Sequence, residues 1–298
     1  MERRRFGNTE MEVSILGFGG AEIGFEGADA ATVERLLGSA LDAGLNMIDT
    51  AECYKDSEEL IGKTVSGRRS EYYLFTKCGH ASGLEGGDWN PKMLAESIDR
   101  SLKRLQTDYV DVVHLHSCNE ETLRQGYVID VLQRAKEQGK TRYIGYSGDH
   151  QAALYAVECG AFDSLETSIN IADQEAIELT LPKATARGMG VIAKRPIANV
   201  AWKYDAKPDV AYHQAYWERL RQLQYEFLKA PMQEVVSTAL RFTLAQPGVC
   251  TAIVGTAKPD RWVENANLVA QGRLPDSTVE AIRRRWAEVA GPDWIGLE

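Results

Sequence analysis

The feature that most constrains the fold is the alternation of short apolar segments with helix-like segments along nearly the whole chain. Eight of the segments have strand character: residues 13–20, 46–49, 72–77, 109–116, 142–147, 163–170, 190–193 and 250–254. Strands that alternate with helices imply a parallel sheet with right-handed crossovers, and eight such units close naturally into a barrel. We therefore expect an α/β fold of the (β/α)8 or TIM-barrel type.

The length of 298 residues lies within the range of a one-domain barrel, so we expect residues 1–298 to form a single domain. Additions to the barrel are predicted as an N-terminal β-hairpin at about 5–14, a glycine-rich loop at 78–89, a large insertion at about 195–231, and a C-terminal helix. An open doubly wound sheet is the alternative. It would require a G-x-G-x-x-G turn after the first strand, and residues 17–20 do not have that spacing.

Several helix boundaries can be read from the sequence. Asn90-Pro91 predicts an N-cap and a first helical position, and Asp56 with Glu59 predicts a capping pair. A single helix is expected over about 121–138, ending at Gly139, and a capping box is expected at Ser277 and Glu280.

Composition excludes several functional classes. The net charge is −9, with 34 basic and 43 acidic residues and no long basic tract, which argues against a nucleic-acid partner. No apolar run reaches the roughly 18 residues of a membrane span, and the basic start lacks the apolar region of a secretory signal. A cytoplasmic location without membrane association is the default expectation. The five cysteines form no CxxC pair, which favours reduced thiols and predicts no metal site.

The predicted strands end in polar residues that a barrel would gather on one face. The carboxyl ends of barrel strands form the active face, and these ends carry Asp49, Lys77, His116, Ser147, Glu166 and Lys194. Tyr54 follows Asp49 closely. A tyrosine near a lysine ammonium becomes a stronger acid, a carboxylate would keep that lysine charged, and a histidine N–H can polarise a carbonyl. Because these groups can move a proton but supply no hydride, the site requires a nicotinamide cofactor.

The set Asp49, Tyr54, Lys77 and His116, in this order and spacing, resembles the catalytic tetrad of the aldo-keto reductase family. The segments 46–54 and 108–116 carry the resemblance, and 57–62 and 101–105 are also similar to that family. The resemblance implies a barrel that binds NAD(P)H across its mouth and reduces aldehydes or ketones, including sugars, to alcohols. Tyr54 would then be the general acid.

The segment after the eighth strand resembles the adenosine-phosphate segment of the same family. It opens a helix, where free backbone N–H groups favour an anion. By position Arg261 would meet the 2′-phosphate and adenine, and the other cofactor residues would be Gly255, Thr256, Lys258, Glu264 and Asn265. Cationic side chains beside an anion site favour NADPH over NADH.

Three positions depart from the usual family pattern around the nicotinamide. A Ser-Asn pair, a Gln and a stacking Tyr are replaced by Ser147-Gly148, Glu166 and Lys194. We expect Glu166 and Lys194 to form an ion pair, since neither charge should be buried alone. A second possibility is that Lys194 and Arg195 meet an anionic substrate or the cofactor pyrophosphate.

The substrate pocket is expected to involve His80, Trp89 and Trp202 around a small carbonyl compound. Two rival functions stay open at this point. One is a class I aldolase or lyase with Lys77 as the Schiff-base residue, and the other is a cofactor-sensing protein with a vestigial site. The sequence does not fix the substrate, the reaction direction or the oligomeric state.

Overall fold

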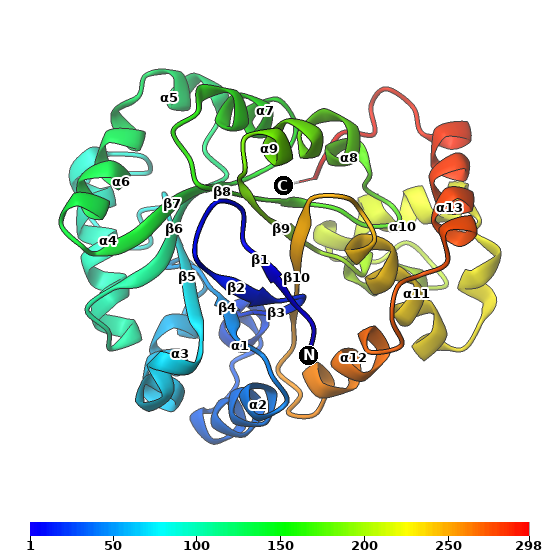
Figure 1. Cartoon of the computed structure of the whole chain (residues 1–298), viewed down its shortest axis with the longest axis horizontal. Helices are drawn as coiled ribbons and strands as arrows, with labels where there is room; N and C mark the ends of the chain where they lie inside the picture. Colours follow the sequence, from blue (N-terminus) through cyan, green and yellow to red (C-terminus); the bar gives the residue numbers. More distant parts are fainter. Residues whose placement is uncertain (298) are drawn as a thin grey trace.

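The computed structural model describes residues 1–297 and is a closed barrel of eight parallel strands surrounded by helices (Figure 1). Around the barrel the strands follow in the order β10-β3-β4-β5-β6-β7-β8-β9. Their bounds are β3 Leu16–Gly19, β4 Met47–Asp49, β5 Tyr73–Cys78, β6 Val110–His116, β7 Thr141–Ser147, β8 Ser164–Ser168, β9 Gly190–Lys194 and β10 Val249–Gly255. The predicted barrel and all eight of its strands are confirmed.

The predicted N-terminal hairpin is also present and covers the amino end of the barrel (Figure 1). It consists of β1 (Arg3–Arg5) and β2 (Glu12–Ser14), which pair antiparallel. Phe6 and Met11 from the hairpin are fully buried against barrel residues such as Phe75 and Ile192. The hairpin therefore acts as an apolar plug, and the first barrel strand begins at Leu16 rather than at the predicted Val13, which belongs to β2.

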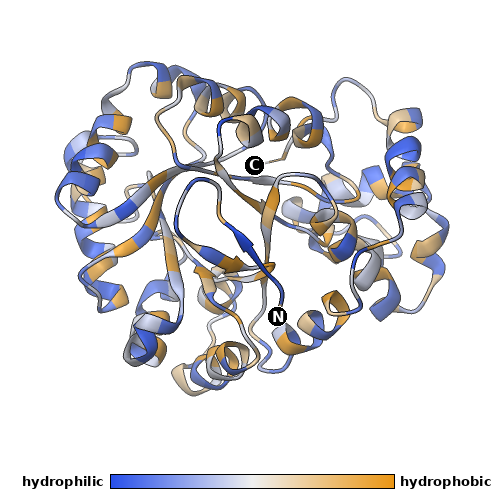
Figure 2. Cartoon of the chain, in the orientation of Figure 1, coloured by the Kyte–Doolittle hydropathy of each residue, from blue (hydrophilic) through white to orange (hydrophobic). Residues whose placement is uncertain are grey.

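Helices cover the outside of the barrel. Figure 2 shows apolar and polar residues alternating along them, as expected for helices that pack one face on a sheet. Their bounds are α1 Ala21–Phe25, α2 Ala30–Asp42, α3 Ser57–Val65, α4 Pro91–Leu105, α5 Glu120–Arg124, α6 Tyr127–Glu137, α7 His150–Cys159, α8 Glu175–Leu179, α9 Leu181–Ala186, α10 Ala211–Leu223, α11 Met232–Leu244, α12 Arg261–Val269 and α13 Asp276–Val289. No helix within residues 1–297 is both long and apolar enough to cross a bilayer.

Three local predictions about helices were wrong. The single helix over 121–138 is two helices, because the chain breaks at Gly126, which adopts φ = 80°. Asp56 precedes α3 but its side chain accepts no capping bond, since its backbone is not extended. The capping box at Ser277 is absent, because α13 already begins at Asp276 after Pro275. The predicted cap at Asn90 is confirmed: its side chain accepts bonds from two backbone N–H groups.

The insertion after β9 and the C-terminal tail meet near the carboxyl face of the barrel. The insertion contains two 3-10 segments, η2 (Ala198–Lys203) and η3 (Glu226–Lys229), on either side of α10. The tail returns to the barrel, where the Leu297 carbonyl accepts a bond from Ser168 Oγ at 3.0 Å and the Leu297 N–H donates to Asp173 at 3.1 Å. The end of the described chain is thereby fixed beside β8.

Candidate active site

The floor of the site is a buried cluster of one ammonium and two carboxylates. Lys77 Nζ donates to Asp49, as predicted, and also lies 3.3 Å from Glu166 Oε2. The three side chains come from β5, β4 and β8 and are almost completely buried. Burial alone would lower the pKa of Lys77 and favour its neutral amine. The charges of Asp49 and Glu166 outweigh burial and raise the pKa of Lys77. Lys77 is therefore held as a charged ammonium.

The two carboxylates oppose each other's ionisation. Burial, and then the charge of Glu166, raise the pKa of Asp49 well above its ordinary value. Burial acts on Glu166 in the same direction, but Lys77 opposes it and brings the pKa of Glu166 below its ordinary value. Of the two carboxyl groups, Asp49 therefore keeps its proton to higher pH than Glu166 does.

Tyr54 and His116 lie directly above this floor. Lys77 Nζ is 5.5 Å from the centre of the Tyr54 ring, and the Tyr54 and His116 rings meet edge to face at 5.6 Å. Burial raises the pKa of Tyr54; Lys77 lowers it, and Asp49 and Glu166 raise it further. The net pKa of Tyr54 therefore lies above that of a free tyrosine, so the expectation that Lys77 makes it a stronger acid was wrong, because burial outweighs the ammonium. Near neutral pH, Tyr54 is a protonated phenol.

The electrostatics of His116 favour a neutral imidazole. Burial, and then the charge of Lys77, lower the pKa of His116 well below its ordinary value. Cys53 Sγ lies 3.4 Å from His116 Nδ1. His114, two residues earlier on β6, is fully buried and its Nε2 lies 2.9 Å from Ser164 Oγ. His114 is therefore a hydrogen-bonded interior residue.

The expected ion pair between Glu166 and Lys194 does not form. Lys194 Nζ lies 2.8 Å from Asp149 Oδ2, while Glu166 pairs with Lys77. The cause is the register of the two strands, because Glu166 lies opposite Ile192 and Lys194 lies opposite Ser168. Lys194 therefore reaches the loop above the barrel, where Asp149 also accepts from Thr167 Oγ1 and from the Ser168 N–H.

A cavity of about 590 Å³ opens above the cluster. The residues that line it include Asp49, Tyr54, His116, Ser147, Glu166, Lys194, Arg195 and Gly255. Gly19, Gly20 and Gly255 contribute main chain to its wall between β3 and β10, beside the side chains of Glu22, Ile253 and Val254. A slot with glycine main chain in one wall, polar groups at its floor and a phenol at its base fits a flat nicotinamide and its ribose.

The predicted adenosine segment continues from this slot. Thr256 and Asn265 are largely buried, and the Thr256 hydroxyl accepts from the Lys258 N–H at 3.0 Å. Helix α12 begins at Arg261, whose N–H donates to the Lys258 carbonyl at 3.2 Å, and no side chain caps the helix start. Arg261 pairs with Glu264 at 3.1 Å, and both side chains are about half exposed. The segment presents one arginine and one lysine next to an uncapped helix start.

The three residues predicted to bind substrate occupy different places. His80 meets His116 edge to face at 5.3 Å and is backed by Trp89 at 5.7 Å. Neither His80 nor Trp89 lines the cavity itself. Trp202 also lies outside it, and its indole N–H points to Met232 Sδ at 3.3 Å.

Sequence reasoning missed several residues in and beside the cavity, among them Phe25, Glu22 and Asp149. Phe25 is 53% exposed at the rim and lies 5.7 Å from the Tyr54 ring, and the Glu22 carboxylate lies against Gly255. Asp149 closes the salt bridge to Lys194. Of these three, only Asp149 had a signal in the sequence, since it follows a predicted strand end by two residues. Nothing in the pattern indicated that Glu22 or Phe25 would face the cavity.

One departure from the family pattern has a steric explanation. A Cβ at position 148 would lie 2.5 Å from the hydroxyl of Tyr146, and that hydroxyl donates to the Cys118 carbonyl at 2.7 Å. A side chain at this position is thus incompatible with the buried Tyr146, which accounts for glycine after Ser147.

A metal ion does not fit the buried cluster. Asp49, His114 and Glu166 offer ligand atoms within 4.8 Å of one another. Lys77 already contacts both carboxylates and supplies the positive charge there. A cation among these groups would face the ammonium at close range, which is unfavourable.

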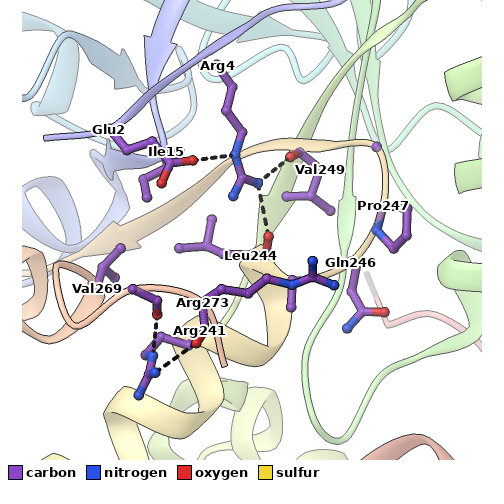
Figure 3. Close-up of a pocket in the computed structure, with 13 residues that line it drawn as sticks. Glu2, Arg4, Ile15, Arg241, Leu244, Gln246, Pro247, Val249, Val269 and Arg273 are labelled. Carbon is purple, nitrogen blue, oxygen red and sulfur yellow. Dashed lines mark hydrogen bonds and ion pairs between the residues drawn. The ribbon is translucent and has the colours of Figure 1, made fainter. Parts of the chain in front are cut away.

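A second cavity, of about 550 Å³, lies at the amino end of the barrel (Figure 3). Two of its three arginines donate to main-chain carbonyls: Arg4 to Leu244 and Val249, both at 2.9 Å, and Arg241 to Gly272 at 2.7 Å. The third, Arg273, pairs with Asp276 at 2.9 Å. Arg4 thereby joins the hairpin to α11 and β10, and Arg241 joins α11 to the segment after α12. We therefore interpret this cavity as structural.

The barrel, its polar mouth and the family match together give the class, an NAD(P)H-dependent oxidoreductase. The sequence model of the Aldo/keto reductase family matches residues 15–287, and the chain belongs to this family. It is 30% identical to L-galactose dehydrogenase of Arabidopsis thaliana, over 91% of this chain and 89% of that protein. It is 26% identical to the uncharacterized oxidoreductase YqkF of Bacillus subtilis, over 95% of this chain and 96% of that protein. Among solved structures, an aldo-keto reductase of Bacillus halodurans in its holo form has a TM-score of 0.83, with 26% identity and 99% of both chains covered.

Proposed function

We propose that this protein reduces aldehydes or ketones with NADPH, with Tyr54 as the general acid and His116 as the residue that orients the carbonyl. The observation that carries the proposal is the placement of the Tyr54 phenol above the charged Lys77, at the base of a cavity with glycine main chain in one wall. The nicotinamide, when bound, supplies the hydride. Residues of this chain supply everything else.

Each residue has a role that follows from its surroundings. Tyr54 gives its proton to the carbonyl oxygen, and Lys77 stabilises the phenolate that remains. Neutral His116 offers a ring N–H to the same oxygen as negative charge develops there. Ser147 and Gly255 line the cavity that would hold the nicotinamide, and Lys258 and Arg261 at the start of α12 would meet the 2′-phosphate that distinguishes NADPH.

The lysine chemistry of an aldolase is not supported. A Schiff-base lysine must lose its proton to attack a carbonyl. Lys77 is held charged by Asp49 and Glu166, and it has no exposed surface.

The test is the variant Tyr54→Phe, assayed by NADPH absorbance against a panel of aldehydes, ketones and sugars. General acid catalysis by a positioned side chain contributes about 10²–10⁴-fold, so turnover should fall by that factor. The dissociation constant of NADPH, measured by fluorescence, should change little. Tyr109→Phe is the matched control, because Tyr109 is 39% exposed just before β6 and stacks on Arg69.

Unchanged turnover in Tyr54→Phe would contradict the assignment of the acid. NADPH binding without turnover of any carbonyl by the intact protein would instead indicate a cofactor-sensing protein.

A further inference from the structure

The buried cluster contains two carboxylates, although one would be enough to balance the charge of its single lysine. Both Asp49 and Glu166 contact the Lys77 ammonium, with Glu166 Oε2 at 3.3 Å. Glu166 is 2% exposed, so water does not screen its charge.

The other charged groups around the cluster do not cancel this surplus. Lys194 on β9 is paired with Asp149 at 2.8 Å, so the two together add no net charge. His114 and His116 on β6 are neutral, because burial lowers the pKa of each. The Cys53 thiol is protonated, since burial raises its pKa to about 12. Ser147 on β7 carries no charge, and Glu22 and Glu26 at the rim add two further carboxylates. The Arg195 guanidinium, which also lines the cavity, donates to the Tyr212 hydroxyl and to the Leu297 carbonyl.

We propose that Glu166 is a positioning residue that extends carbonyl reduction to more alkaline pH, by placing a second negative charge beside Lys77 and so disfavouring the Tyr54 phenolate. This inference rests on the function proposed above. A proton shared between two carboxyl groups is lost at lower pH than the proton of a phenol. Asp49 and Glu166 are therefore both ionised in the alkaline range where Tyr54 titrates, and Lys77 can offset only one of them.

The step that Glu166 influences is balanced as follows. In reduction, a hydride reaches the carbonyl carbon and the Tyr54 proton reaches the oxygen, which leaves an alcohol, an oxidised cofactor and a phenolate. The phenolate then recovers a proton from solvent. Alcohol oxidation is the reverse and needs the phenolate. A change in the pKa of Tyr54 must therefore move the alkaline limb of reduction and the rising limb of oxidation together.

The decisive variant is Glu166→Gln, which keeps the shape of the side chain and an oxygen that can face Lys77. Removal of one unscreened negative charge should make it easier for Tyr54 to ionise. The pH at which kcat for reduction falls on the alkaline side should therefore move down by about 1 unit. The rising limb of oxidation should move by the same amount. Glu166→Asp retains the charge and should retain the profile of the unmodified protein. Glu58→Gln is the matched control, because Glu58 is equally buried but bonds to Thr76 and Arg104 away from the cavity.

A second readout requires neither cofactor nor turnover. Ionisation of Tyr54 is followed by tyrosinate ultraviolet absorbance, as the difference between the protein and its Tyr54→Phe variant. The same difference is taken in the Glu166→Gln background, where the transition should lie at lower pH. Unchanged limbs and an unchanged transition in Glu166→Gln would overturn the inference. Full turnover in Tyr54→Phe would overturn the proposed function itself, so the two failures are distinguishable.

Discussion

Lys194 Nζ lies 2.8 Å from Asp149 Oδ2, and this salt bridge joins the end of β9 to the loop that follows β7. Asp149 is 1% exposed and also accepts bonds from Thr167 and Ser168. The pair therefore connects the ends of β7, β8 and β9 at the cavity rim. Because Lys194 pairs with Asp149, Glu166 pairs with Lys77 instead.

The stability of this rim can be measured with Lys194→Met. Loss of the ammonium removes a charge-assisted hydrogen bond from a buried carboxylate, so we expect the free energy of unfolding to fall by about 1.5–3 kcal/mol. Adding Asp149→Asn should recover part of that loss, because no buried charge is then left unpaired. The measurement is urea denaturation of both variants at neutral pH.

The control for this experiment is Lys183→Met. Lys183 pairs with Glu158 in a bridge whose two side chains are about half exposed, and surface pairs of this kind contribute about 0–1 kcal/mol. If Lys194→Met were no more destabilising than Lys183→Met, the bridge to Asp149 would not be a structural contact of the rim.

Cofactor preference is the second prediction, and it depends on the start of α12. Arg261→Ala should weaken NADPH binding by at least about tenfold, because a charged hydrogen bond to a phosphate is worth about 1.5–3 kcal/mol. NADH has no 2′-phosphate, so its affinity should change much less. Isothermal titration of both cofactors measures the ratio.

Arg124→Ala is the control for cofactor binding, because Arg124 pairs with Glu120 on α5. Equal losses for NADPH and NADH in Arg261→Ala would mean that Arg261 contacts a part common to both cofactors. The preference for NADPH would then have to come from another residue.

Much of the barrel could be predicted from the sequence because its signals are periodic and local. Apolar strands that alternate with amphipathic helices left few topologies open, and the neighbours Asp49 and Lys77 followed from the order of their strands. The partner of Lys194 could not be predicted in this way. It depends on a stagger of two residues between β8 and β9, which places Lys194 beside Ser168 rather than Glu166. Register in a closed barrel is set by packing around the whole ring.

The break at Gly126 and the tail contact at Leu297 were missed for related reasons. A glycine inside a helical pattern permits a break but does not require one. The tail is held by Ser168 and Asp173, which are distant in sequence and are brought together only by the completed fold.

The third prediction concerns stability in acid and follows from His114. Burial, the largest cause, lowers the pKa of His114 to about 4, whereas an unfolded histidine titrates near 6.5. Because the folded-state pKa is the lower one, the unfolded chain binds the proton more tightly between these values. Stability is therefore fully present above pH ~6.5 and falls as the pH falls toward ~4, by on the order of 3 kcal/mol from this residue.

The measurement is urea denaturation at several pH values between about 7 and about 5, for the protein and for His114→Asn. The variant should be less stable at neutral pH, because it loses the packed ring beside Gly145 and the bond to Ser164. Its stability should nevertheless decline less steeply with acid. His116 has a pKa that is lowered in the same direction, so part of the decline will remain.

His150→Asn is the matched control: His150 is 37% exposed, pairs with Glu175 and should leave the steep decline in place. Equal slopes in the protein and in His114→Asn would mean that His114 accepts a proton in the folded state as readily as in the unfolded chain.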